Sequence, residues 1–538
     1  MSTDNLTLSP ATELSSPPQE PVSARAEAAP AKKDWNITQL ILFRISFVFF
    51  LIMSIPSTTV WYTKLFSVNW FNLHYRDLHD IASIQPNFVN FRGSSSLWAL
   101  NGYGNWAISL AVATIVAANW TLLAKRPKNY DILYYWLRVI VRYRAGIGII
   151  GFGFTKLFPV QMPYPSISLL NNDFGDLTGH KIFWSFIGIA PWYQIFTGIV
   201  EVAGGAMLFF RKTTFLGAAI LFGALLDIVI VNFAYEGGVH VYSSYFVLFS
   251  GFLLLYYVPR IYKLLVLENY TVPVNYYPVL TENWQKYGRI ILKTTAIFIF
   301  LPLFFYLQYL DFRYDPYKQP AVAGVKKLRG YYDVAEFRIN NKLIPYSPVD
   351  SVRWNEVTFE RWSTLTYKQK RPVPLDLSNG GGDPMRDIDR NFELTGVAGG
   401  RRVFYYQVDT TTQTLYLQDK FLPTRKKNSD IEDSKKSKAT GAELYPENWI
   451  SKEAQKNFGD ENLKIAKIAQ SNRRTREYNV THPEDALRKK MILKYETTDG
   501  KKVILKGINE NRDSLYIVLN RVEKEYAIPT STLDAGKY

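Results

Sequence analysis

The sequence predicts a polytopic α-helical membrane bundle of about seven spans, followed by a C-terminal, mainly β domain outside the cytoplasm. Three observations predict this fold class. Seven stretches of about 20 mainly apolar residues, the length that crosses a bilayer, fall before residue 310. Basic residues gather beside these stretches at alternate ends. Residues 310–538 contain short runs rich in β-branched and aromatic residues, separated by polar turns.

Residues 1–34 open the chain and are rich in Pro, Ala, Ser and Glu, with no aromatic residue. Such a composition cannot bury enough apolar surface to fold, so we expect a disordered tail on the cytoplasmic side. No apolar core begins until Leu40, which is unlike a secretory signal peptide.

The expected spans divide into three units. Residues 35–131 hold two spans joined by a long aromatic outer loop (57–105), residues 132–265 form a four-helix bundle, and residues 266–309 supply a linker and the last span. Tyr and Trp in the outer loop favour the headgroup level, so we expect interfacial helices there. The seven spans are 38–56, 106–124, 140–159, 189–210, 213–234, 240–258 and 288–309.

Basic residues beside the spans predict the orientation. The clusters are Lys32 with Lys33, Lys125 with Arg126 and Lys128, Arg211 with Lys212, Arg260 with Lys263, and Lys286 with Arg289. All of them fall on one side, and the positive-inside rule makes that side cytoplasmic. An odd number of spans then places residues 310–538 in the periplasm. We expect a multi-pass protein of a bacterial cytoplasmic (inner) membrane. Part of the net charge of +16 sets the orientation of the spans, and no nucleic-acid partner is expected.

Residues 142–158 contain the string Gly146-x-Gly148-x-x-Gly151, which matches the dinucleotide-binding fingerprint. Its neighbours, among them Ile147 and Phe152, leave no polar helix face of the kind that a soluble crossover helix shows. Small residues at this spacing let membrane helices approach closely, and this is the favoured interpretation. The expected packing glycines are Gly146, Gly148, Gly151, Gly153, Gly198, Gly204 and Gly205.

The C-terminal domain contains an internal repeat. Residues 399–417 align with 499–517, so that Gly400 matches Gly500. Each copy is a β-rich run, a polar turn and a second run, which is typical of a hairpin. We expect a β-rich periplasmic domain, either a sheet or an open barrel, with two related hairpins. A charged insertion at 420–490 is expected to be solvated, with one helical piece near 459–472.

Ionisable side chains within membrane spans are costly and mark pockets or partners. Counting depth along antiparallel spans predicts a buried pair of Glu201 with Arg144 and a second pair of Lys156 with Asp227. Two interpretations stay open, namely structural ion pairs and a polar pocket for a quinone, a lipid headgroup or a proton path. The candidates for the pocket are Arg142, Arg144, Lys156, Glu201, Asp227 and His240.

Several other chemistries are excluded or disfavoured. The chain has no cysteine, which excludes disulfides, thiolate metal sites and cysteine catalysis, and its five histidines disfavour bis-histidine haem. His74 and His79 lie near two aspartates, but incidental histidines in an aromatic loop are favoured over a metal site. The turn at 379–383 lacks the alternating acidic ligands of a calcium loop. No metal is expected and catalytic residues stay unknown.

Two stretches, "YRAGIGIIGFGFTKLF" and "EVAGGAMLFFRKTTFLGAAILFGALL", resemble DoxX/DoxD-type membrane proteins. This resemblance implies a four-helix bundle in spans three to six, and a role like that of the small subunits of terminal quinol oxidase or thiosulfate:quinone oxidoreductase. The first span contains "LFRI", which is similar to the start of the membrane half of vitamin K-dependent carboxylase-like proteins. Those proteins also have a β-rich exoplasmic domain. The residues on the DoxX pattern are Arg144, Lys156, Glu201, Gly204, Gly205 and Arg211.

Three functions follow as expectations. The first is an accessory or partner-binding envelope protein, whose bundle anchors the β-domain toward an unknown periplasmic protein. The alternative is a quinone-linked redox protein or subunit, with electrons supplied by a partner. The second alternative is a carboxylase-like enzyme that modifies a lipid or quinone, with Lys156 or His240 as base. Quinone and lipid are the candidate ligands, no cofactor is firmly predicted, and whether the protein is an enzyme stays open.

Overall fold

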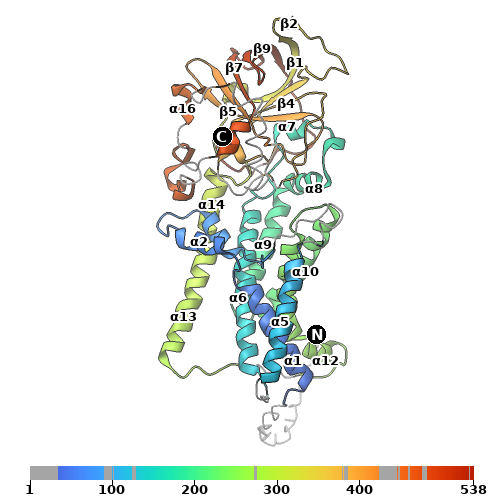
Figure 1. Cartoon of the computed structure of the whole chain (residues 1–538), viewed down its shortest axis with the longest axis vertical. Helices are drawn as coiled ribbons and strands as arrows, with labels where there is room; N and C mark the ends of the chain where they lie inside the picture. Colours follow the sequence, from blue (N-terminus) through green and yellow to red (C-terminus); the bar gives the residue numbers. More distant parts are fainter. Residues whose placement is uncertain are drawn as a thin grey trace, which may run out of the picture.

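The fold is known from a computed structural model, in which a helical bundle lies at one end of an elongated molecule and a β-barrel at the other (Figure 1). The structure describes residues 34–89, 100, 102–123, 129–271, 276–378, 380, 386–422, 445, 449–458, 461–474, 482–531 and 533–538. Residues 1–33 of the predicted tail, the turn at 379–383 apart from Gly380, and residues 423–444 of the insertion lie outside the described residues.

The bundle contains apolar helices that could cross a membrane. Within the described residues, four helical runs are long and apolar enough to cross, or six if each of two bent pairs is one span. The predicted number of seven spans is not confirmed, because α6 carries four basic residues along its 27 residues. The helices are α1 (Ile37–Ser54), α5 (Gly104–Leu123), α6 (Asp131–Leu157), α9 (Pro191–Leu208), α10 (Thr214–Ala234), α11 (His240–Leu255), α12 (Val258–Leu265), α13 (Asn283–Phe298) and α14 (Phe304–Tyr314).

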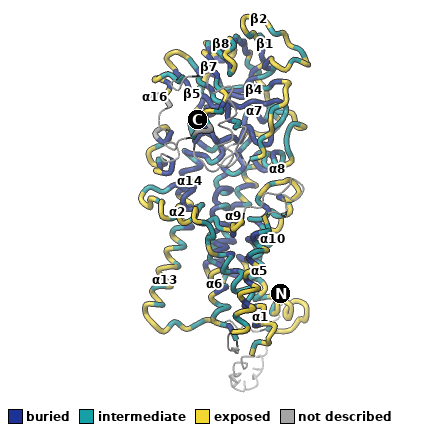
Figure 2. Tube along the Cα trace, in the orientation of Figure 1, coloured by how far each residue is buried: buried dark blue, intermediate teal, exposed yellow. Residues whose placement is uncertain are grey.

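The last of these runs, Asn283–Tyr314, links the bundle to the barrel. α13 passes through a five-residue π-turn, η3 (Ile299–Leu303), into α14. Pro302 lies in this turn and cannot supply a backbone donor, which accounts for the break in the regular hydrogen-bond pattern. α14 buries several side chains under the barrel, whereas α13 has no buried residue and diverges from the other helices (Figure 2).

Glycines lie where α6 packs against α9. A Cβ atom on Gly198 would come within 2.4 Å of the backbone nitrogen of Leu157, and one on Gly205 within 2.8 Å of Ile149. A Cβ atom on Gly146 would come within 2.9 Å of the carbonyl oxygen of Gly205. Only residues without a side chain allow the two backbones to approach this closely. The other expected packing glycines (Gly148, Gly151, Gly153 and Gly204) also face neighbouring helices.

Gly198→Ala is expected to lower the free energy of unfolding by about 1–3 kcal/mol, because the new methyl group would press on the backbone of α6. The measurement is the thermal unfolding midpoint of the purified protein in mild detergent. Gly223→Ala is the matched control, since nothing lies within 4 Å of a Cβ atom at this helical glycine. An equal loss in both variants would show that helix propensity, and not close packing, sets the effect.

The C-terminal domain is an eight-stranded antiparallel β-barrel, so the predicted mainly β domain is confirmed, as a closed barrel. β1 pairs with β3, each strand from β3 to β9 pairs with the next along the chain, β9 closes the barrel on β1, and the short β2 pairs only with β1. Buried side chains such as Tyr332, Phe404 and Leu505 fill the interior. The strands are β1 (Gly330–Ile339), β2 (Lys342–Leu343), β3 (Glu356–Phe359), β4 (Thr364–Lys368), β5 (Arg401–Asp409), β6 (Thr414–Asp419), β7 (Lys490–Glu496), β8 (Lys502–Ile508) and β9 (Ser514–Arg521).

Both copies of the internal repeat form β-hairpins, β5 with β6 and β8 with β9. Gly400 and Gly500 precede the first strand of each hairpin with φ of +75° and +79°, a backbone conformation that favours glycine. The hairpins differ at their turns, since Val408 lies opposite Leu415 whereas Gly507 lies opposite Leu515. One extra residue in the second turn therefore shifts its register relative to the first.

The segment between α6 and α9 attaches the bundle to the barrel, and the sequence analysis did not foresee this role. It contains α7 (Ile167–Leu170), η2 (Phe174–Asp176) and α8 (Gly179–Gly188). The buried carboxylate of Glu360, next to β3, accepts hydrogen bonds from the backbone nitrogens of Ile167 and Ser168 at 2.9 and 2.8 Å. Leu177 forms a bridge with Val397 of the barrel domain. The barrel is therefore seated on the bundle by packed contacts.

Candidate functional site

A cavity of about 100 Å³ lies in the half of the bundle that faces the barrel. Its walls come from α6, α9, α10 and α11, and further lining residues come from α8, from α3 (Tyr75–Ala82) in the outer loop and from the segment after α14. Aromatic and aliphatic side chains make up much of the lining, and a few polar groups converge within it. The lining residues are Arg76, His79, Ile149, Phe152, Thr155, Lys156, Gln161, Trp184, Glu201, Leu225, Ile228, Val239, Tyr242, Ser243, Phe246 and Tyr317.

Lys156 and Glu201 form a buried ion pair in this cavity. Lys156 lies in the last turn of α6 and Glu201 lies midway along α9, where the α6–α9 contact brings them together. The side chain of Glu201 is 2% exposed, and its Oε1 accepts a hydrogen bond from the ammonium of Lys156. Within the described residues, Glu201 Oε2 has no hydrogen-bond partner. A buried carboxylate oxygen without a donor is costly, so a donor supplied by a ligand would stabilise it.

The predicted pair of Glu201 with Arg144 is wrong. Arg144 donates instead to the backbone carbonyls of Ala82 and Ile84, both at 2.7 Å, and its guanidinium lies over the ring of Tyr245. Ala82 ends α3, where helix carbonyls lack partners within the helix. Arg144 therefore fastens the outer-loop helix to the bundle. Counting depth along the spans misplaced Arg144, because Glu201 lies beside Gly153, more than two helical turns further along α6.

The other predicted pocket residues are dispersed. Asp227 is exposed on α10, so the predicted pair of Lys156 with Asp227 is also wrong. His240 is buried at the start of α11, where its ring packs against Phe233 at 4.8 Å, and it does not line the cavity. Arg142 donates to the carbonyl of Leu208 at 2.9 Å and lines separate pockets at the opposite end of the bundle. The structure thus brings together Lys156 and Glu201 among the six candidates.

Sequence reasoning missed the residues that the cavity takes from outside the spans. Arg76 and His79 come from α3, a short helix in the aromatic outer loop whose residues Arg76 and Asp77 are buried. Trp184 comes from α8, and Tyr317 follows α14. Tyr242 and Ser243 lie on α11, three residues or fewer from the predicted His240. The strong amphipathic pattern of "YRDLHDIA" was the one signal that could have predicted the packing of α3 against the bundle.

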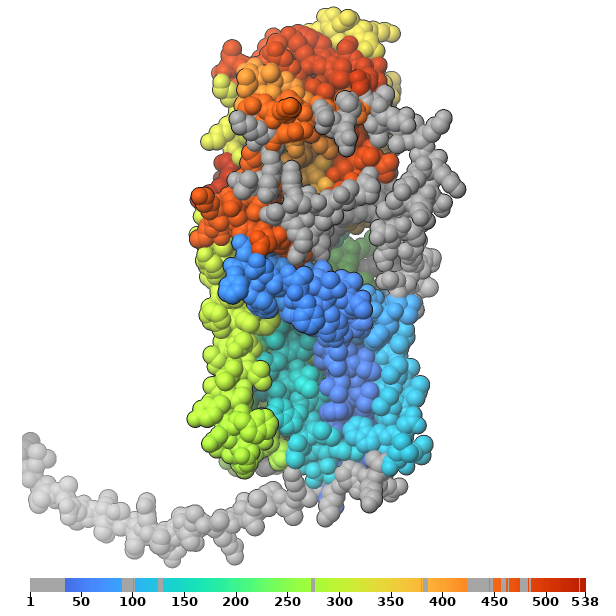
Figure 3. All heavy atoms as spheres, turned by 60° about the vertical axis from the view of Figure 1, so that its left-hand side comes forward, coloured from blue at the N-terminus to red at the C-terminus, as the bar shows by residue number. Residues whose placement is uncertain are grey.

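A network of buried charges lies above the cavity and joins four parts of the chain. Arg473 pairs with Asp77 and Asp80 of α3 at 3.1 and 3.0 Å. Arg474 pairs with Asp387 at 3.0 Å and with Asp315, which follows α14. The prediction of a solvated insertion is wrong for Arg473 and Arg474, which are buried. Figure 3 shows the α2–α3 segment as a band between the bundle and the barrel.

Protonation in this network follows from burial and from the excess of arginine near Asp315. Burial would raise the pKa of Asp315, but Arg390 and Arg474 outweigh this effect and hold the pKa below its usual range. Burial lowers the pKa of His74, and the neighbouring Asp315 opposes this only in part. Burial, followed by the nearby Asp387, raises the pKa of Glu461 to about 8. At neutral pH we therefore expect an ionised Asp315, a neutral His74 and a largely protonated Glu461.

His74, Asp77 and Asp80 of the outer loop have structural roles. His74 Nδ1 accepts from the backbone nitrogen of Arg76, and Asp77 accepts from the backbone nitrogen of His74, which forms a capping box for α3. Asp80 pairs with Lys64 of α2 (Thr59–Ser67) at 3.0 Å. Across the part of the chain that the structure describes, no group of three or more His, Asp or Glu side chains is placed to hold a metal ion.

Comparisons with known proteins leave the family open. No protein-family model matches the chain, and no solved structure matches it. A curated relative, the uncharacterized protein YwoB of Bacillus subtilis, is 32% identical over 66 residues. The match covers 12% of this chain and 43% of the relative, less than half of its length. The resemblance to DoxX/DoxD-type proteins therefore stays a prediction, as do the activity and partners of the whole protein.

Proposed function

We propose that this protein binds the head of a quinone in the cavity of Lys156 and Glu201. The observation that carries the proposal is the ion pair itself, a proton donor beside an incompletely bonded carboxylate, in a mainly apolar and aromatic pocket. Ligand sites of this kind use apolar walls for affinity and a few polar groups for orientation.

The lining of the cavity favours a flat ring. A dry cavity of about 150 Å³ holds a benzene-sized molecule, so the cavity of about 100 Å³ admits a quinone ring only if its side chains move apart. Phe152, Trp184 and Phe246 offer aromatic surfaces on which a flat ring can stack or pack edge-on. A phosphate headgroup would instead meet Lys156, whose charge Glu201 already balances, and Arg76, whose guanidinium lies over the ring of Tyr317. These features favour a quinone over an anionic lipid at this site.

The polar groups can hold both oxidation states of the ring. The ammonium of Lys156 can donate to a quinone carbonyl, and Glu201 Oε2 can accept from the hydroxyl of a quinol. Because both groups are buried, such hydrogen bonds would be stronger than in water. The site residues would thereby bind and orient the ring, and a partner protein would exchange electrons with it.

The contacts of the barrel with the bundle support its role as a cap over the cavity of Lys156 and Glu201. Arg473 and Arg474 tie the segment below the barrel to α3 and Asp315, and α3 supplies two residues of the cavity. This seating favours ligand binding over the expectation of a simple anchor for an envelope domain. The accessory role toward a periplasmic partner and the carboxylase-like enzyme activity both stay predictions, as does the orientation in a bacterial inner membrane.

The test is to extract the protein in mild detergent and identify bound small molecules by mass spectrometry, followed by titration with decylubiquinone. We expect co-purified quinone near one equivalent, and at least tenfold weaker decylubiquinone binding in Glu201→Gln, because one charged hydrogen-bond acceptor contributes roughly 1.5–3 kcal/mol. Asp227→Asn is the matched control, since it also removes one carboxylate but from the exposed face of α10.

Three outcomes would overturn the proposal. They are phospholipid as the sole bound molecule, no decylubiquinone binding by the wild-type protein, or equal affinity in Glu201→Gln and Asp227→Asn. Tryptophan fluorescence is a suitable signal for the titration because Trp184 lines the cavity. A Trp184→Phe variant identifies the share of the quenching that comes from this residue.

A further inference from the structure

A second candidate site lies at the end of the bundle opposite the barrel. Two adjoining pockets meet there, and they share Tyr135, Val139, Arg142 and Arg211 in their walls. The larger has a volume of about 290 Å³ and lies between α6, the end of α9, the segment before α13 and α13 itself. This site is independent of the proposed quinone cavity, since the two have no lining residue in common.

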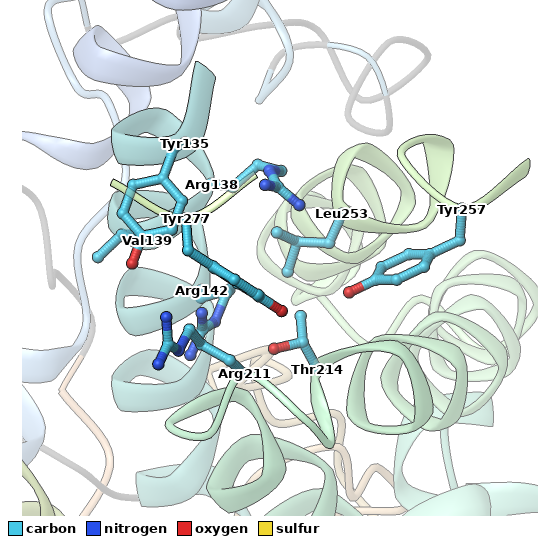
Figure 4. A pocket seen from close by; sticks show the side chains of 9 residues that line it. All are labelled: Tyr135, Arg138, Val139, Arg142, Arg211, Thr214, Leu253, Tyr257 and Tyr277. Carbon is cyan, nitrogen blue, oxygen red and sulfur yellow. The ribbon is translucent and has the colours of Figure 1, made fainter. Parts of the chain in front are cut away.

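Five cationic side chains line these two pockets. Figure 4 shows Arg138, Arg142 and Arg211 around the smaller pocket, together with Tyr135, Tyr257 and Tyr277. Arg289 and Lys293 of α13 line the larger one. Within the described part of the chain, no carboxylate lines either pocket. Such a concentration of like charge repels itself, and a bound anion would relieve that repulsion.

The contacts of these cations hold them in place without neutralising them. Arg142 Nε donates to the backbone carbonyl of Leu208. Arg138 lies 3.6 Å from the ring centre of Tyr256, and Arg211 lies 4.4 Å from that of Tyr277. Lys293 lies 4.3 Å from the ring of Phe210. Cation–π contacts orient a cation but leave its charge and most of its donors available to an anion.

The surroundings of the larger pocket suit a lipid better than a soluble anion. α13 has no buried residue, and its apolar side chains Ile290 and Leu292 are 53% and 74% exposed. Trp136 and Ile290, which line the pocket, are themselves exposed to the side of the bundle. In Figure 3 the surface is recessed between α13 and α1. Acyl chains lying against α13 would cover apolar surface that no described part of the protein covers.

We propose that this site binds an anionic phospholipid, with its phosphate among Arg142, Arg211, Arg289 and Lys293 and its acyl chains between α6 and α13. Arginine forks match phosphate oxygens, and basic pockets between membrane helices bind anionic headgroups at the bilayer surface. The lipid fills the space between α13 and the bundle, and thereby holds the helix that leads through the π-turn into the barrel.

The test measures binding of phosphatidylglycerol to the full-length protein in mild detergent. The binding signal is the rise of the thermal unfolding midpoint with added lipid, with phosphatidylcholine and inorganic phosphate in parallel. We expect a rise with phosphatidylglycerol alone, and roughly 10- to 30-fold weaker binding in Arg211→Gln/Lys293→Gln. The matched control is Lys212→Gln/Lys263→Gln, which removes the same charge at the same end from two exposed residues that line neither pocket.

The outcomes separate the sources of the anion. An equal rise with phosphatidylcholine would show that the acyl chains alone bind, and an equal rise with inorganic phosphate would show a site for a soluble anion. Either result overturns the assignment, as does equal weakening in the two double variants. If the Arg211→Gln/Lys293→Gln protein is unstable, native mass spectrometry of the wild-type and control proteins replaces the titration. Co-purified phosphatidylglycerol on both proteins supports the site, and its absence refutes it.

Discussion

Arg474→Met is expected to lower the free energy of unfolding by about 3–5 kcal/mol, because it removes one partner from a buried ionic network. Arg474 pairs with Asp315 and with Asp387 at 3.0 Å, and its side chain is 1% exposed. Without it, the carboxylates keep Arg390 as their nearest buried cation. The lost stability should therefore appear where this network joins the bundle to the barrel.

The measurement for Arg474→Met is the thermal unfolding midpoint in detergent, combined with limited proteolysis at the joint. Arg338→Met is the matched control, because Arg338 forms an exposed pair with Glu336 on the barrel and such pairs contribute little. New cleavage between the bundle and the barrel is expected in Arg474→Met alone. Similar midpoints for the two variants would contradict the role of the network as the joint.

Lys156→Met is expected to be nearly as damaging, with a loss of about 3–5 kcal/mol, since it leaves the buried carboxylate of Glu201 without its cation. Glu201→Gln should cost less, because glutamine keeps the shape and an acceptor. The double variant should lose about 1–3 kcal/mol less than the sum of the single losses, as residues in direct contact do. Unfolding in increasing dodecyl sulfate is the measurement.

A second mutant cycle, of Arg144→Met with Glu201→Gln, is the control for the first. Arg144 donates to Ala82 and Ile84, so its loss should add to that of Glu201→Gln within about 0.5 kcal/mol. Strong coupling in this cycle, with additivity for Lys156 and Glu201, would favour the pairing predicted from depth along the spans and contradict the structure.

The barrel illustrates which features of the fold were predictable. Residues of alternating burial in "TLYLQD" are typical of a strand because successive side chains point to opposite faces, and "SLYIVLNR" is a short run rich in β-branched and aromatic residues. The repeat predicted two hairpins from Gly400 and Gly500. Closure of β9 on β1 was not predictable, because it pairs residues such as Tyr332 and Arg521 that are far apart along the chain. An open and a closed sheet have the same local pattern.

The sequence by itself determined the apolar helices with basic residues beside them, the glycine-rich helix contacts and the two-part division of the chain. Each of these features depends on residues within a few turns of one another. The tertiary structure alone decided which charges meet. Lys156 and Arg144 lie on one helix about three turns apart, and the contact of α6 with α9 places Lys156 beside Glu201 whereas Arg144 reaches α3. It also brought α3 and residues 461–474 to the joint, since ion pairs that span hundreds of residues leave no local pattern.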